Sequence, residues 1–133
     1  MTNKRSFVFA IIGILALASF FRFYKLPSVH PGLYPDEAMN GNNALEAIKT
    51  NDFKIFYPEN NGREGLFINI QALFLKFLLP ENGHPEPWML KLPSAIFGIL
   101  TVLGVFFLAR ELFRNYHGNK IALLSSFFLA VSF

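Results

Sequence analysis

Long apolar runs alternate with a polar middle segment along this chain. The first run, FVFAIIGILALASFF at residues 7–21, follows Lys4 and Arg5 and extends with little interruption to Tyr24. At about 1.5 Å per residue, a helix of this length approaches the roughly 30 Å hydrocarbon core of a bilayer. The pattern therefore predicts a first transmembrane helix over about residues 6–24.

A cleaved signal peptide is the alternative interpretation of this first run. The start of the chain is basic, and the triplet Ala-Leu-Ala at 16–18 fits a small-x-small cleavage site. The apolar run continues past that site through Phe20 and Phe21, and further apolar segments follow. A membrane anchor is therefore the favoured interpretation.

Two later apolar runs predict two more membrane helices. The run WMLKLPSAIFGILTVLGVFFLA predicts a second transmembrane helix at about 88–109. Another run starts at Ile121 and is still apolar where the sequence stops at Phe133. We expect a third transmembrane helix from about 121, truncated by the end of the sequence.

The distribution of charge predicts the orientation of these helices. Residues 110–120 hold three basic groups and one acidic group, and the first five residues hold two basic groups and no acidic one. Residues 22–91 hold seven basic and eight acidic groups. Basic loops face the cytoplasm, so the outer loop is predicted at 25–87 and the N-terminus in the cytoplasm. The predicted fold is all-α, integral and multi-pass, in the plasma (cell inner) membrane.

Two helices are predicted within this outer loop. The segment DEAMNGNNALEAIKT predicts a surface helix at about 36–50, after a stretch in which prolines prevent helix formation. The segment 65–79 is apolar but short for a span, and it contains Asn69, Gln71 and Lys76. If it crossed the membrane, the charge bias would be inverted. We favour a helix lying along the membrane surface over a crossing helix.

Composition agrees with a membrane protein and excludes several classes of function. The chain is 53% hydrophobic and 16% charged, more apolar than a typical soluble domain. It has no cysteine, which excludes disulfides, thiol catalysis and zinc sites with Cys ligands. It has no basic block of the kind that binds nucleic acid. His30, His84 and His117 lack a ligand partner at helical spacing, so we interpret them as loop residues.

The adjacent carboxylates Asp36 and Glu37 are the most notable polar feature of the outer loop. As a structural pair, Asp36 would cap the helix 36–50 and Glu37 would favour its first turn, together contributing about 1–2 kcal/mol. As a catalytic pair, Asp36 would remove a proton from an acceptor hydroxyl, an effect worth about 10²–10⁴-fold in rate. Composition alone does not choose between these roles.

Four features in order carry a family resemblance: the N-terminal span, the acidic pair, NGREGLFINIQALFLKFLLP, and PWMLKLPSAIFGILTVLGVFFLARELF. Together they resemble the opening of a GT-C glycosyltransferase of the dolichyl-phosphate-mannose protein mannosyltransferase and aminoarabinose transferase superfamily. The resemblance covers essentially the whole chain. It implies transfer of a sugar from a polyprenyl phosphate to a protein, lipid or glycan acceptor at the outer face. It also implies that Asp36 and Glu37 belong to the active site, with Asp36 as the base.

A lipid-phosphate donor needs cations for its phosphate and apolar walls for its chain. Arg63, Lys76 and Lys91 are the candidate phosphate-binding residues. The alternative for each is a solvated or snorkelling side chain at the interface. Glu64 could ligate a divalent metal, as a carboxylate near this point does in some relatives.

Two departures from the family pattern change the expectation. The chain is much shorter than typical members, so we expect an N-terminal fragment that is inactive alone. Gly65 stands where relatives often carry proline, and we expect it to loosen the start of the second outer helix. A non-enzymatic alternative is a small membrane protein whose outer loop binds lipid or partner subunits.

Overall fold

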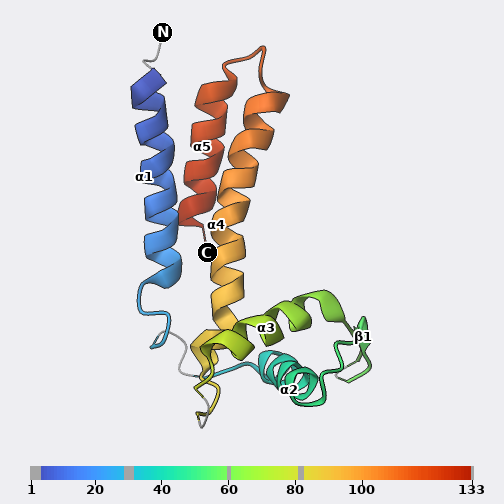
Figure 1. Cartoon of the computed structure of the whole chain (residues 1–133). Coiled ribbons are helices and arrows are strands. Elements are labelled where there is room, and N and C mark those ends of the chain that lie inside the picture. The colour runs from blue at the N-terminus through green and yellow to red at the C-terminus, as the bar shows by residue number, and fades with distance from the viewer. Residues whose placement is uncertain (1–3, 29–31, 60, 81–82, 133) are drawn as a thin grey trace. The chain divides into compact units, whose positions relative to one another are not determined.

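The computed structural model describes residues 4–28, 32–59, 61–80 and 83–132, and this part of the chain is mostly helical (Figure 1). The elements are α1 (Lys4–Phe23), α2 (Pro35–Thr50), β1 (Phe56–Tyr57), β2 (Arg63–Glu64), α3 (Gly65–Leu78), α4 (Pro87–Leu112) and α5 (Gly118–Val131). A helix is present in each range where the sequence predicts one, and the helix ends differ from the predicted ends by less than one turn. The helical fold class is therefore confirmed. The short strands β1 and β2 are the unpredicted elements.

The described chain folds as two units. We call Met1–Tyr24 with Ala95–Phe133 the helical unit, and Lys25–Ser94 the loop unit. Helix α4 contributes its first turns to the loop unit and the rest of its length to the helical unit.

Helices α1 and α5 and the later part of α4 make up the helical unit. Helix α1, over Arg5–Phe23, and helix α4 are both long and apolar enough to cross a membrane. Helix α5 is apolar but has 14 residues, or about 21 Å at 1.5 Å per residue. The buried contacts between these helices come mainly from small side chains, while many large apolar side chains point outward. The two hydrophobic clusters in this unit consist of the buried residues Ala18, Val102, Phe106, Ala109, Ala122 and Ala130.

Arg22 makes polar contacts inside the helical unit. Its guanidinium donates to the carbonyl oxygens of Leu129 at 3.4 Å and Ala130 at 3.3 Å, near the end of α5. A Cβ at Gly98 would lie only 2.5 Å from Nε of Arg22. The glycine therefore gives the arginine side chain room to lie against α4.

Helix α2 packs against α3 through small side chains in the loop unit. Gly41, Ala44 and Ala47 recur at helical spacing on its buried face. A Cβ at Gly41 would lie 2.6 Å from Cδ1 of Leu90, so glycine permits the close approach of α4. The core of this unit contains Ala44, Ala47, Tyr57, Ile68, Ala72, Leu75, Met89 and Leu90.

The polar residues that make α3 unusual for a membrane span are bonded within the loop unit. The Asn69 side chain accepts a hydrogen bond from Tyr57 Oη at 2.8 Å and donates one to the Lys54 carbonyl at 3.0 Å. Gln71 Nε2 donates to the Leu90 carbonyl at 3.0 Å. These amides therefore tie α3 to the hairpin and to the start of α4.

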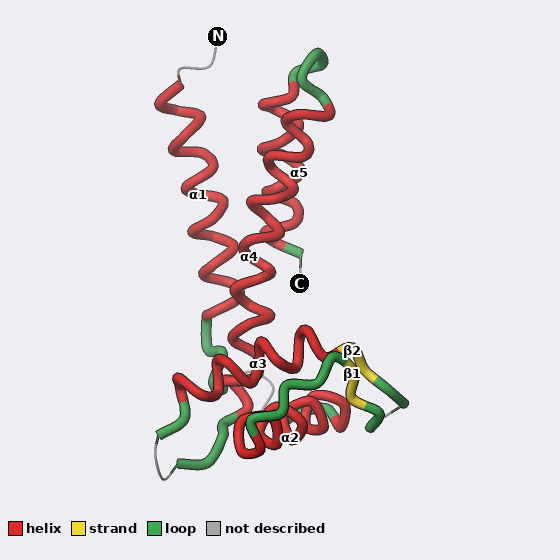
Figure 2. Tube along the Cα trace, turned by 45° about the vertical axis from the view of Figure 1, so that its right-hand side comes forward, coloured by secondary structure: helices red, strands yellow, loops and turns green. Residues whose placement is uncertain are grey.

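A two-stranded hairpin precedes α3, shown in yellow in Figure 2. Strands β1 and β2 are antiparallel, with Tyr57 opposite Arg63. The backbone turns through Asn61 and Gly62, which have positive φ angles of 67° and 82°. Asn-Gly is a strong turn signal, but the strands have only two residues each, too short for an alternating pattern to predict them.

Gly65 fixes the start of α3, so the expectation that it loosens this start is wrong. Its N–H donates to the Ile55 carbonyl at 2.7 Å. A Cβ at this position would overlap the carbonyl oxygens of Lys54 and Ile55. Proline would also lack the N–H, so in this fold glycine is required for close packing.

Candidate functional site

Helix α2 begins one residue before the acidic pair. Tyr34 is the N-cap, with an extended backbone at φ −61° and ψ 150°, and Pro35 is the first helical residue. Proline suits this position because its fixed φ is helical and its missing N–H would have no partner there. Asp36 therefore lies inside the first turn, and the expectation that Asp36 caps the helix is wrong.

Glu37 performs the stabilising function at the start of α2. Its Oε2 accepts a hydrogen bond from the Tyr34 backbone N–H at 3.2 Å. This is the bond that a carboxylate at the third helical position makes in a capping box. The two acidic residues therefore differ: the structure accounts for Glu37 by helix capping and leaves Asp36 for another interaction.

Asp36 forms an ion pair with Arg63. Oδ2 of Asp36 lies 2.9 Å from Nη2 of Arg63, and the two side chains are 63% and 32% exposed. Asp36 comes from α2 and Arg63 from β2, so the hairpin brings the guanidinium to the carboxylate. An ion pair this exposed contributes only about 0–1 kcal/mol to stability. The predicted base and the predicted phosphate ligand are thus in direct contact.

A groove of about 400 Å³ lies beside Arg63. Arg63 and Asn40 supply polar groups to its lining, and Leu66 and Phe67 supply apolar ones. Arg63 Nε and Asn40 Oδ1 are both buried and have no hydrogen-bond partner among the described residues. Such an unmet polar group costs about 1–3 kcal/mol, which makes both residues candidates for a role in binding.

The sequence did not point to Asn40. Asn40 is four residues after Asp36 on α2, and residues at this spacing lie on the same face of a helix. That spacing is the signal that could have identified it. Because Asn40 is a polar residue one helical turn after the candidate base Asp36, the spacing alone could have added it to the predicted site.

A second groove, of about 670 Å³, lies at the start of α2. Glu37 and Lys91 line it together with the apolar side chains of Leu33 and Pro35. Nζ of Lys91 donates to the Gly32 carbonyl at 3.2 Å. The structure therefore brings together Lys91 and Glu37, two of the predicted site residues, in one groove.

Lys76 lies apart from these grooves. It is in the last turn of α3 with an exposed side chain, and it lines neither of them. Three residues were predicted to bind phosphate. In the structure, Arg63 and Lys91 lie near the acidic pair, whereas Lys76 lies away from it, near the end of α3.

The candidate metal ligand Glu64 is the N-cap of α3 and lines the groove beside Arg63. It is the only carboxylate in that lining. The described ranges contain no group of three or more His, Cys, Asp or Glu side chains placed to hold a metal. Because hard divalent cations take several oxygen ligands, Glu64 and the other described donors around this groove do not by themselves fit such a metal.

The histidines agree with their interpretation as loop residues where the structure describes them. His84 lies in the segment before α4, and His117 is the N-cap of α5 with a positive φ of 55°. His30 lies outside the described residues.

Comparisons with protein-family models, with curated proteins and with solved structures found no match to this chain. The family resemblance therefore depends on the ordered sequence segments quoted above, and function is argued from the site itself.

Proposed function

We propose that this chain is the N-terminal part of a GT-C membrane glycosyltransferase, which transfers a sugar from a polyprenyl phosphate to an acceptor hydroxyl at the outer face of the membrane. The ion pair between Asp36 and Arg63 is the observation that carries the proposal. It joins the two kinds of group that the reaction requires, a carboxylate for the acceptor proton and a cation for the donor phosphate.

The membrane location is supported by the outward-facing apolar side chains of α1, α4 and α5. With basic residues concentrated at the chain start and between α4 and α5, the positive-inside rule places the loop 25–87 on the outer side.

Helix α3 suits a position along the membrane surface. It has 14 residues, about 21 Å at 1.5 Å per residue, which is short for a roughly 30 Å hydrocarbon core. Ile68 and Leu75 are buried in the loop unit, whereas Leu66 and Phe77 are exposed. A helix with one face packed on protein and other apolar side chains exposed can bury the latter in the interface.

In the proposed reaction, Asp36 accepts the proton of the acceptor hydroxyl. The acceptor oxygen forms a bond to the anomeric carbon of the sugar, and the bond from that carbon to the phosphate oxygen breaks. The polyprenyl phosphate leaves with the electron pair of the broken bond. Arg63 stabilises the charge on the departing phosphate through charge-assisted hydrogen bonds.

The ion pair gives this scheme an order of events. A carboxylate held 2.9 Å from a guanidinium is a weakened base, and the guanidinium is partly occupied. A phosphate is a strong bidentate partner for arginine and competes with Asp36 for Arg63. A donor phosphate that binds Arg63 therefore weakens the contact between Arg63 and the carboxylate of Asp36.

Lys91 is the second proposed phosphate ligand. Its groove has apolar walls from Leu33 and Pro35, which suit the first isoprene units of the donor. In this arrangement Glu37 holds the start of α2 in place beside Lys91 through its bond to Tyr34. Glu37 is then a positioning residue, and Asp36 is the catalytic one.

Transfer activity tests the proposal directly. The protein translated from the complete reading frame containing this sequence would be assayed in membrane vesicles with a labelled polyprenyl-phosphate sugar. Asp36→Asn should lower transfer by about 10²–10⁴-fold without changing the amount of protein in the membrane. Arg63→Gln should raise the KM for the donor as well as lower kcat.

The matched control is Asp52→Asn, which removes an exposed carboxylate from the same loop unit. This variant should retain normal transfer. Near-normal turnover by the Asp36 variant would overturn the enzyme proposal and favour a loop that only binds lipid or partner subunits.

A further inference from the structure

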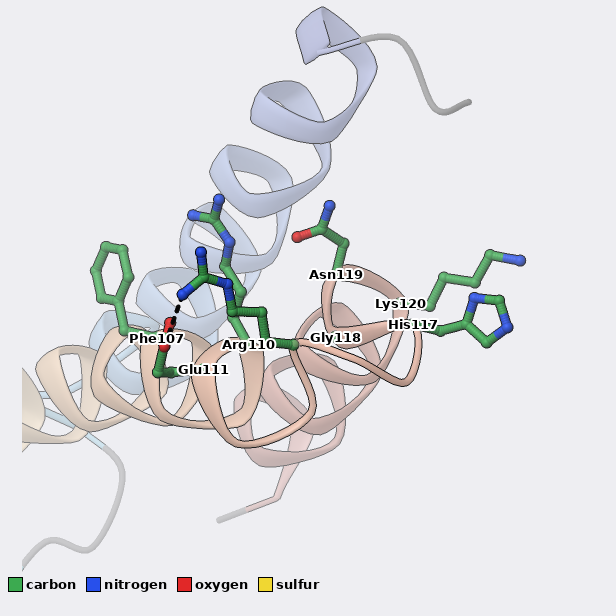
Figure 3. Close-up of a pocket in the computed structure, with 8 residues that line it drawn as sticks. Phe107, Arg110, Glu111, His117, Gly118, Asn119 and Lys120 are labelled. Carbon is green, nitrogen blue, oxygen red and sulfur yellow. Dashed lines mark hydrogen bonds and ion pairs between the residues drawn. The ribbon is translucent and has the colours of Figure 1, made fainter.

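The turn between α4 and α5 carries a cationic groove in the helical unit, separate from the acidic pair. The groove has a volume of about 820 Å³ (Figure 3). Arg110 and Arg114 line it from the end of α4 and the turn, and Lys120 lines it from the first turn of α5. In the sequence, these residues contributed only to the predicted orientation of the helices. In the structure, they line the same groove.

The groove has an excess of positive charge. Glu111 is the one carboxylate in its lining, and it pairs with Arg114 at 3.5 Å. Arg110 lies over the ring of Phe7, with Cζ 5.9 Å from the ring centroid, so its charge is not neutralised by that contact. In Figure 3 the Lys120 side chain lies across from Arg110 and points away from it. The three basic residues of the lining, Arg110, Arg114 and Lys120, therefore outnumber its one carboxylate.

Apolar side chains surround the same turn. Phe107 is 56% exposed, Leu112 is 69% exposed and Tyr116 is 75% exposed. A free anion would need only the charges. A phospholipid offers a phosphate for the cations and acyl chains for the exposed apolar groups, so the combination favours lipid over a free phosphate ion.

We propose that this groove binds the phosphate headgroup of an anionic phospholipid in the leaflet next to the α4–α5 turn. The positive end of the α5 dipole, at Gly118 in the same lining, adds to the attraction. This inference rests on the membrane location of α4 in the proposed function and does not depend on sugar transfer.

Lipid selectivity of the purified chain tests the inference. The chain would be reconstituted in nanodiscs containing both phosphatidylglycerol and phosphatidylcholine, and the lipid retained on mild detergent extraction would be measured by native mass spectrometry. The wild-type chain should retain phosphatidylglycerol preferentially. Arg110→Gln with Lys120→Gln should lower that preference about 30-fold, at roughly 1 kcal/mol for each basic group near an anionic surface.

The control pair is Lys25→Gln with Lys49→Gln, which removes the same charge from exposed positions of the loop unit. It should leave the preference unchanged. Equal losses in the two double variants would show a general charge effect and overturn the inference. Circular dichroism checks the helix content of every variant. Lys120→Gln alone, at an exposed position, should still show an intermediate loss of the preference for phosphatidylglycerol.

A separate arm distinguishes lipid from free phosphate. Inorganic phosphate would be added to the chain in nanodiscs of phosphatidylcholine only. Saturable phosphate binding that disappears in the Arg110 and Lys120 variant would assign the groove to a free anion and overturn the lipid inference. No donor sugar is present in these measurements, so their failure would leave the transferase proposal standing.

Discussion

The two units of this chain are stabilised in different ways. The loop unit buries Ile68, Leu75 and Tyr57 together and completes its core with side-chain hydrogen bonds. The helical unit buries mostly alanines and leaves large side chains such as Phe9 and Phe128 exposed. The loop unit therefore has a core of large side chains, whereas the helical unit exposes large apolar side chains and contains α1 and α4, which are long and apolar enough to cross a membrane.

The largest expected effect on stability is a cavity in the loop unit. Leu75→Ala removes a fully buried side chain and should destabilise this unit by about 2–5 kcal/mol. Phe128→Ala, at an exposed site of the helical unit, should change stability by less than about 0.5 kcal/mol. Hydrogen exchange of the amides in α3 and α5 in detergent micelles measures both. A larger effect at Phe128 than at Leu75 would reverse the comparison.

A glycine pair sharpens the same comparison. Gly65→Ala places a Cβ against the carbonyls of Lys54 and Ile55 and should cost the loop unit about 1–3 kcal/mol. Gly13→Ala in α1 meets no atom within 4 Å and should stabilise the helix by about 0.5–1 kcal/mol. Thermal unfolding, monitored by hydrogen exchange of the backbone amides in each unit, distinguishes the two outcomes. Tolerance of alanine at Gly65 would mean that the backbone at Lys54 and Ile55 lies less close to the start of α3 than the structure shows.

The smallest expected loss of stability is at the groove beside Arg63. Asn40→Leu removes a buried oxygen that has no partner among the described residues and whose burial costs about 1–3 kcal/mol, so stability should be unchanged or higher than in the wild type. If Asn40 binds substrate, transfer by the complete protein should fall while stability does not. A matched loss of stability and activity would instead make Asn40 part of the core.

Much of the secondary structure could be predicted from local pattern. The apolar runs locate α1 and α4, and the prolines before Asp36, of which Pro35 is the first residue of the helix, locate the start of α2 within one residue. The hairpin could not be predicted in this way, because its strands are too short to show a period of two. The role of Gly65 could not be predicted from the sequence either, because it depends on contact with Ile55 on another segment.

The candidate site was predicted only in part. The structure gathers five of the predicted residues near the start of α2 and the hairpin: Asp36, Glu37, Arg63, Glu64 and Lys91. Which acidic residue caps α2 could not be settled from sequence, because Pro35 shifts the start of the helix by one position. That shift assigns the cap bond to Glu37.

The sequence by itself determined the helices and their apolar character, since run length and charge act locally along the chain. Only the tertiary structure decided that Arg63 forms an ion pair with Asp36 and that Lys76 lies apart from it. The physical reason is that an ion pair depends on a separation of a few ångströms between segments distant in sequence. Here the turn at Asn61 and Gly62 and the close packing at Gly65 set that separation.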